Sequence, residues 1–245
     1  MNNYNLFAEF YDSLTENVDY KVRSDYISNF FSTSGKGKGK GSVLDLACGT
    51  GSISKYLCMK GYSVIGMDLS DEMLTVAASK LIEGLTLVKG DMTEFSLPYK
   101  VDYCVCSLDA INHITDYSDV IKCFKCVYDS LNVGGVFVFD VNTIHKHKNI
   151  LGNNSFVFDE ENYFLAWENY FTEPDTVDIY LDFFVYNGSN YDRFSEHIKE
   201  KAYSIDSLRK GLKMYGFEIV GIYDELTEIE PKDNSERVYF VCRKV

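Results

Sequence analysis

Two glycines and one carboxylate are spaced in this chain as they are in nucleotide pockets. Gly49 and Gly51 follow the apolar run 43–48, and Asp68 ends a second apolar run seventeen residues after Gly51. A glycine lets the backbone approach a ligand where a Cβ would block it. A carboxylate at the tip of the second strand can accept hydrogen bonds from both hydroxyls of a ribose. The spacing therefore predicts a nucleotide pocket in which Asp68 holds a ribose.

Two further positions indicate which nucleotide fits. A dinucleotide fingerprint needs a third glycine at position 54, where this chain has Ser54. Asp45, four residues before Gly49, would repel a pyrophosphate and attract a cationic group such as an ammonium. An NAD-dependent oxidoreductase is therefore the less favoured hypothesis, and a ligand that carries positive charge is favoured.

The segment 43–51 resembles motif I of the class I S-adenosylmethionine-dependent methyltransferases, whose usual form is (V/L)-L-(D/E)-x-x-x-G-x-G. The resemblance continues through Asp68, through Gly90-Asp91-Met92 after a third strand, through the strand at 101–109, and through the L-x-x-G-G turn at 131–135. Five motifs in order make the match specific. It implies S-adenosylmethionine as the cofactor and methyl transfer as the reaction.

The resemblance also implies a role for each motif residue. Asp45 would serve the methionine ammonium, directly or through water, and Asp68 would hold the ribose. Asp91 would accept a hydrogen bond from the adenine amino group, with Leu69 and Met92 on either side of the ring. The complete predicted cofactor site lies in the N-terminal segment and at the strand ends: Tyr11, Asp45, Ala47, Gly49, Gly51, Asp68, Leu69, Asp91, Met92, Ser107 and Asp109.

A narrower resemblance comes from three other segments. The box F-A-x-x-Y-D at 7–12, the F-D-x-N at 139–142 and the W-E-N at 167–169 are together similar to small bacterial methyltransferases of the sugar N,N-dimethyltransferase and glycine N-methyltransferase-like type. This similarity implies a small-molecule acceptor, methylated at nitrogen rather than at oxygen or carbon. Tyr11, in the first box, would place its ring near the sulfonium, where cation–π attraction is worth about 0.5–2 kcal/mol.

Methyl transfer from a sulfonium is an in-line displacement, so positioning should outweigh acid–base catalysis. An amine acceptor must first lose a proton, and a base with a pKa near neutrality helps. The predicted catalytic residues are His113, past strand four, His197, on an insertion strand, and Tyr11. Alternation puts His197 on one face with Ser195 and Lys199 and leaves open whether that face is the cleft or solvent.

The elements that must position these residues alternate between strand and helix, which favours a parallel sheet with right-handed crossovers. The predicted fold is α/β, a Rossmann-like, seven-stranded, mostly parallel sheet with helices on both faces. The expected strands lie near 43–48, 63–68, 85–89, 101–107, 135–141, 217–223 and 238–243, the last two paired antiparallel at the sheet edge, and the helices near 51–60, 70–80, 115–131 and 204–215.

Residues 154–203 interrupt this pattern. Their aromatic-rich segments of alternating polarity are separated by turns, which predicts an antiparallel β-ribbon inserted after strand five. Residues 1–153 and 204–245 would then form the S-adenosylmethionine-binding domain. The insertion is expected to cover the cleft at the carboxyl edge of the sheet, and the N-terminal segment 6–12 to close it from the other side.

Composition and net charge limit the kinds of substrate and partner that we expect. The net charge of −13 argues against a nucleic-acid substrate, because phosphate binding needs a basic face. No apolar run approaches a membrane span, and seven scattered cysteines favour the cytoplasm. The C-x-x-C at 123–126 has no second pair at zinc spacing, so we predict buried thiols and no metal. The Lys–Gly run 35–41 is typical of a solvated connector.

We therefore expect a monomeric or homodimeric cytoplasmic enzyme that acts on a small molecule. Two alternatives stay open at this point. One is a methyltransferase for a protein or another macromolecule, although the N/D-P-P-Y motif is absent after strand four, where 107–110 reads S-L-D-A. The other is a non-catalytic S-adenosylmethionine-binding sensor.

Overall fold

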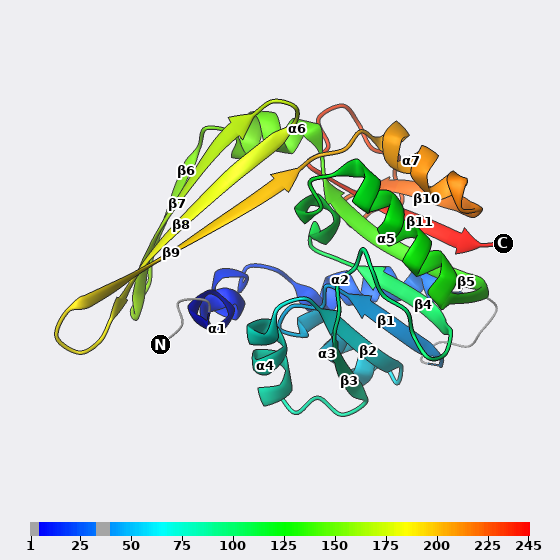
Figure 1. Cartoon of the computed structure of the whole chain (residues 1–245), viewed down its shortest axis with the longest axis horizontal. Coiled ribbons are helices and arrows are strands. Elements are labelled where there is room, and N and C mark those ends of the chain that lie inside the picture. Colours follow the sequence, from blue (N-terminus) through cyan, green and yellow to red (C-terminus); the bar gives the residue numbers. More distant parts are fainter. Residues whose placement is uncertain (1–4, 33–39) are drawn as a thin grey trace.

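The computed structural model describes residues 5–32 and 40–245 (Figure 1). Most of the predicted Lys–Gly connector, residues 35–39, lies outside the described residues. Two sheets are present, and they are joined through the end of β5 and the start of α7 (Ile205–Met214). Among the described residues, no helix is long and apolar enough to cross a membrane.

The larger sheet has seven strands in the order β10-β11-β5-β4-β1-β2-β3. Neighbours from β3 to β5 pair in parallel, and β11 pairs antiparallel with both β5 and β10. The predicted fold class is confirmed. The strands are β1 (Ser42–Leu46), β2 (Ser63–Asp68), β3 (Leu85–Lys89), β4 (Val101–Cys106), β5 (Leu131–Asn142), β10 (Phe217–Asp224) and β11 (Arg237–Lys244).

Helices cover both faces of this sheet because successive strand residues point to opposite sides. Leu44 and Leu46 of β1 face a core shared with α5 (Tyr117–Ser130) and α7, whereas Val43 faces a second core shared with α2 (Tyr20–Phe31) and α3 (Ser52–Met59). Helix α4 (Asp71–Ser79) begins at a Ser70 cap that accepts the Met73 N–H, with Asp71 and Glu72 at the positive end of its dipole.

One boundary differs from the prediction. Strand β5 begins at Leu131, before the Gly134-Gly135 turn, and not at 135. Leu131 already pairs with Val101, and an irregularity in the β4–β5 register then absorbs the turn, in which Gly134 has a φ of +78°. The glycines therefore lie inside a strand that carries a bulge, and they do not precede it.

The second sheet is an antiparallel meander of β6 (Ser155–Asp159), β7 (Tyr163–Thr172), β8 (Thr176–Tyr186) and β9 (Tyr191–Lys201). These strands fall within the predicted insertion, 154–203. We call this sheet the ribbon. Its inner face packs on α1 (Asn5–Leu14), where the Phe10 ring stacks on Phe183 at 5.9 Å between centroids. Figure 1 shows α1 between the ribbon and the larger sheet.

Candidate functional site

A cavity of about 680 Å³ opens where the carboxyl ends of β1, β2 and β4 meet α1 and β9. Open parallel sheets bind ligands outside this edge. The residues that line it come from all of these elements: Phe7, Ala8, Tyr11, Tyr20, Asp45, Ala47, Cys48, Gly49, Thr50, Ser52, Ile53, Asp68, Leu69, Ser70, Glu72, Met73, Met92, Ser107, Leu108, Ala110, His113, Glu196 and Ile198.

Asp68 and the glycine turn form one hydrogen-bonded unit. The Gly49 N–H donates to Oδ2 of Asp68 at 2.7 Å, and the Ser70 N–H donates to Oδ1 at 2.9 Å. Gly49 has a φ of +54°, and a Cβ on it would meet no atom within 4 Å. A carboxylate has about four acceptor positions, so Asp68 retains capacity for a ligand after these two bonds. The turn and the carboxylate therefore present an open backbone and free acceptor positions to the cavity.

Asp45 lies at the bottom of the cavity and is 2% exposed. Ser54 donates a hydrogen bond to its Oδ2 at 2.5 Å. Burial and, to a smaller extent, the nearby charge of Asp68 raise the pKa of Asp45 to about 7, against the opposing effect of the hydrogen bond from Ser54. Ser54, which the sequence analysis used only to exclude a dinucleotide, thus holds the carboxylate in place.

Helix α1 is held against the glycine turn at 49–51 through Asp12. Thr50 Oγ1 donates to Asp12 Oδ1 at 2.6 Å, and Lys80 Nζ lies 2.5 Å from Asp12 Oδ2. Tyr11, one residue earlier, lines the cavity, and burial raises the pKa of its phenol far above the ordinary value. The hydroxyl is therefore protonated at neutral pH and can take part in hydrogen bonds but cannot act as a base.

The loop after β4 is held in an unusual backbone conformation. Leu108 and Asp109 have φ of +58° and +54°, a region that costs energy for residues other than glycine. Their N–H groups donate to the two carboxylate oxygens of Asp140 at 2.9 and 3.1 Å. Buried Arg237 pairs with Asp140 and, at 2.6 Å, with Asp109. Burial would raise the pKa of Asp109, but Arg237 outweighs it and lowers that pKa to about 2.

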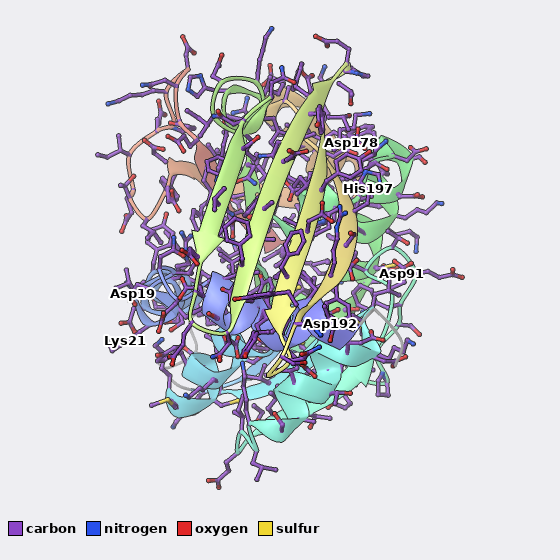
Figure 2. All side chains as sticks on the ribbon, turned by 90° about the vertical axis from the view of Figure 1, so that its left-hand side faces the viewer. Asp19, Lys21, Asp91, Asp178, Asp192 and His197 are labelled. Atoms are coloured by element: carbon purple, nitrogen blue, oxygen red, sulfur yellow. The ribbon has the colours of Figure 1, made fainter. Side chains whose placement is uncertain are left out.

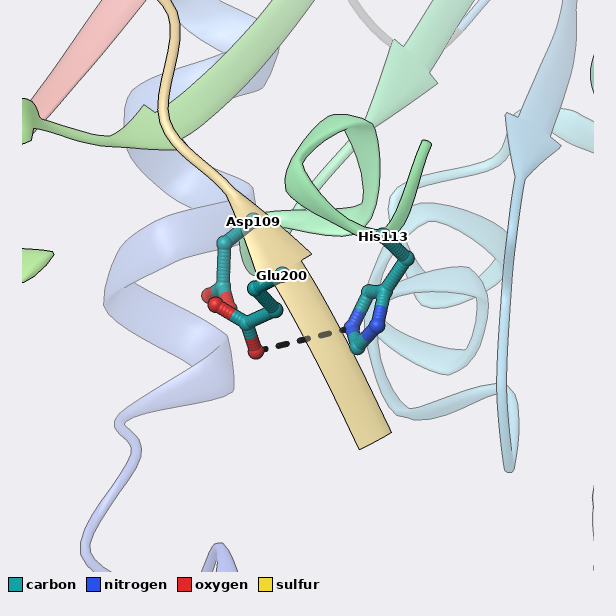
Figure 3. A group of neighbouring side chains, drawn as sticks. All are labelled: Asp109, His113 and Glu200. Carbon is teal, nitrogen blue, oxygen red and sulfur yellow. Dashed lines mark ion pairs between the residues drawn. The ribbon is translucent and has the colours of Figure 1, made fainter. Parts of the chain in front are cut away.

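His113 ends this loop and borders the cavity with 44% of its side chain exposed. Its Nε2 lies 3.9 Å from Oε1 of Glu200, near the end of β9 (Figure 3). One ligand atom each from Asp109, His113 and Glu200 lie within 4.8 Å of one another. Within the described ranges, this is the group of side chains that could hold a cation.

Nine of the predicted site residues line the cavity: Tyr11, Asp45, Ala47, Gly49, Asp68, Leu69, Met92, Ser107 and His113. Three others do not. Gly51 precedes α3, and a Cβ on it would face Ala77. Exposed Asp91 accepts the Thr93 N–H of its own turn. Asp109 pairs with Arg237 beside the cavity. Their roles remain predictions.

The structure contradicts the catalytic placement predicted for His197. Its Nε2 bonds Asp178 at 2.9 Å, and its ring stacks on Tyr180 with centroids 4.4 Å apart. Figure 2 looks onto this outer face of the ribbon, with Asp178 and His197 side by side. Glu196 and Ile198, its neighbours in β9, line the cavity instead. Alternation along the strand therefore carries His197 away from the cavity.

Sequence reasoning missed the acidic character of the cavity. Asp45, Asp68, Glu72 and Glu196 line it, and among the described residues no lysine or arginine does. It also missed Glu200 and Arg237. For Glu196 and Glu200 the available signal was the alternation that places them with Ile198 opposite His197. No local sequence pattern indicated a role for Arg237, which is a single basic residue at the start of a strand.

Comparisons with known proteins agree with this geometry. A model of the methyltransferase domain matches residues 43–135. The Bacillus subtilis (strain 168) protein named "Putative methyltransferase YqeM" is 32% identical, with 98% of this chain and 97% of that protein covered. The crystal structure of an S-adenosylmethionine-dependent methyltransferase from Clostridium acetobutylicum ATCC 824 is 37% identical, with 99% of each chain covered and a TM-score of 0.88. The sugar N-methyltransferase KedS8 from Streptoalloteichus sp. ATCC 53650 shares the fold at 19% identity, with 98% and 92% covered and a TM-score of 0.80.

Proposed function

The chain belongs to the class I S-adenosylmethionine-dependent methyltransferases, and from this premise we propose that it methylates a small molecule at nitrogen. It is an enzyme with S-adenosylmethionine as its cofactor. The single observation that carries the choice of nitrogen is the charge of the cavity, which has four carboxylates and, among the described residues, no cationic side chain in its lining. Such a lining favours an amine over an acidic acceptor.

The residues of the cavity fit the cofactor. Asp45 would bind its ammonium, Asp68 its ribose, and the backbone of Ala47 and Gly49 would lie against its tail. When bound, the cofactor supplies a methyl group that is already activated by a sulfonium. The described side chains then need to exclude water and hold the acceptor in line. Helix α1 and strand β9, whose residues line the cavity, would serve both purposes.

Support for a small acceptor comes from the volume of the cavity, about 680 Å³, and from its two candidate contact residues. Tyr11 reaches the cavity from α1 and His113 from the loop after β4. Tyr11 would contribute its aromatic face and a protonated hydroxyl. The sugar N-methyltransferase KedS8 shares the fold, which is compatible with an amine acceptor. We place the reaction in the cytoplasm because all seven cysteines are free thiols.

A labelled-methyl screen tests this proposal. The enzyme is incubated with methyl-labelled cofactor and, separately, with alkylamines, amino acids, amino sugars, matched alcohols and unfolded protein. We expect label to enter the amines and not the alcohols. Transfer to alcohols alone would reject nitrogen as the acceptor atom, and transfer only to protein would identify a macromolecular methyltransferase. No transfer to any of these or to cell extract would favour a binding protein without catalysis.

A further inference from the structure

We propose that Asp109, His113 and Glu200 bind an alkylammonium group of the acceptor that is separate from the nitrogen that receives the methyl group. We call these three residues the ammonium site. The inference rests on the proposed function, since it assigns a substrate class to the same cavity. It predicts that the preferred acceptors carry at least two amino groups, as small diamines do.

The site has hydrogen-bonding capacity that the protein leaves unused. Glu200 is 6% exposed, and its Oε2 faces inward, 3.5 Å from Nδ2 of Asn142 and 3.4 Å from Nε2 of His147. Its Oε1 points toward His113 (Figure 3), and within the described ranges no group donates a hydrogen bond to it. The same holds for Oδ2 of Asp109, whose Oδ1 binds Arg237. Both oxygens can therefore accept a hydrogen bond from a ligand that donates.

The geometry suits an ammonium because an alkylammonium has three N–H donors. Asp109 and Glu200 each offer a carboxylate oxygen and His113 offers an imidazole nitrogen, and these three acceptors lie within 4.8 Å of one another. His113 also lines the cavity, so the site borders it, and a bound molecule would extend from there into the cavity.

The surrounding charges favour a monocation over a divalent metal ion. The connected network contains four carboxylates, those of Asp109, Asp140, Glu200 and Glu225, and three cations, Arg23, Arg237 and Lys146. These seven side chains sum to one negative charge. One ammonium neutralises it, whereas a divalent ion would leave an excess positive charge beside buried Arg237, which is unfavourable at low dielectric.

An amine held in this way cannot be the nucleophile. Two carboxylates favour its protonated form, and a protonated nitrogen has no lone pair with which to attack the methyl group. The nucleophilic nitrogen must therefore be another atom of the acceptor, and the ammonium site orients the molecule. On this account His113 accepts a hydrogen bond from the anchored group, and it is a specificity residue and not a base.

Binding is tested first, with propylammonium chloride titrated by calorimetry into the complex of the enzyme with S-adenosylhomocysteine. Glu200→Gln keeps the side-chain shape and removes the charge, so it should weaken propylammonium binding by at least about tenfold. The matched control is Glu168→Gln, the same change on the outer face of the ribbon. Equal affinity in wild type and Glu200→Gln overturns the site, as does micromolar Mn²⁺ binding that excludes propylammonium.

Catalysis separates this inference from the proposed function. With a diamine acceptor, Glu200→Gln should raise KM at least about tenfold with kcat within about twofold, while a monoamine of equal length shows little change in KM. Unchanged affinity for S-adenosylhomocysteine and an unchanged melting temperature show that the variant is folded. Equal effects on diamine and monoamine reject the ammonium site but leave amine methylation standing. Methylation of alcohols alone rejects the proposed function, and the propylammonium titration still tests the site.

Discussion

The two halves of the cavity are built in different ways. The proposed cofactor half comes mostly from one stretch, residues 45–70, and relies on backbone N–H groups and on contacts such as that of Gly49 with Asp68. The proposed acceptor half gathers Tyr11 and His113, with Glu200 next to His113, from distant parts of the chain. Arg237 and Asp140 hold the loop after β4. A local motif thus forms most of the cofactor half, and long-range charge pairs support the acceptor half.

The largest expected effect is a loss of stability when the buried arginine next to the acceptor half is removed. Arg237→Ala would leave Asp109 and Asp140 buried without their cation, which should lower the free energy of unfolding by about 3–5 kcal/mol. Urea denaturation measures this. Arg243→Ala, on the same strand but paired at the surface with Glu218, should cost about 1 kcal/mol or less. Similar losses in both variants would show that the buried pairs do not organise the acceptor half.

The next effect belongs to the cofactor half. Asp68→Ala removes the predicted ribose ligand and the acceptor of the Gly49 N–H, so affinity for S-adenosylhomocysteine should fall at least about tenfold by titration calorimetry. Asp71→Ala, an exposed carboxylate of the adjoining helix, is the control. Unchanged affinity in Asp68→Ala would reject the ribose assignment.

Asp45 provides a pH-dependent test of the same half. Its pKa is raised to about 7, so the contribution of this group to apo stability is present at low pH and is lost as pH rises through 7. The cofactor ammonium requires the ionised carboxylate, which faces Asp68 and Cys48. Affinity for S-adenosylhomocysteine should therefore fall by up to about tenfold between pH 8 and pH 6.

The control for that pH dependence is Asp45→Asn. This variant should be more stable than wild type at pH 8, the difference should shrink by pH 5, and its cofactor affinity should not follow the wild-type pH profile. A wild-type affinity that stays flat from pH 8 to pH 6 would contradict an ammonium contact at Asp45.

The smallest expected effect, on the KM of the acceptor, tests whether the ribbon contacts the acceptor and not the cofactor. Ile198 lines the cavity from β9, so Ile198→Ala should raise the acceptor KM about three- to fivefold through lost apolar contact and leave S-adenosylhomocysteine affinity unchanged. Val157→Ala, exposed on β6, should change neither. Equal loss of acceptor and cofactor affinity in Ile198→Ala would show that the ribbon serves both halves.

The contrast between a local cofactor half and a long-range acceptor half also explains which features could be predicted from the sequence. Apolar strands ending in Gly49 and Asp68 are local patterns, so the strand positions and the sheet type followed from them. Alternation showed that His197 shares a face with Lys199 but could not tell which face meets the cavity, because that depends on how α1 packs against the ribbon. Arg237 lies far along the chain from Asp109 and Asp140, and no local spacing links them.

Helix α1 has a consequence for the order of events in turnover. The helix is held to the glycine turn through Asp12, and partly buried Phe7 and Phe10 pack against the ribbon. Residues of α1 line the same cavity as the proposed cofactor residues, so we expect this helix to move when the cofactor enters and the acceptor to bind against it afterwards. Steady-state kinetics should therefore follow a compulsory sequence, in which the methyl donor enters first and its demethylated by-product departs last.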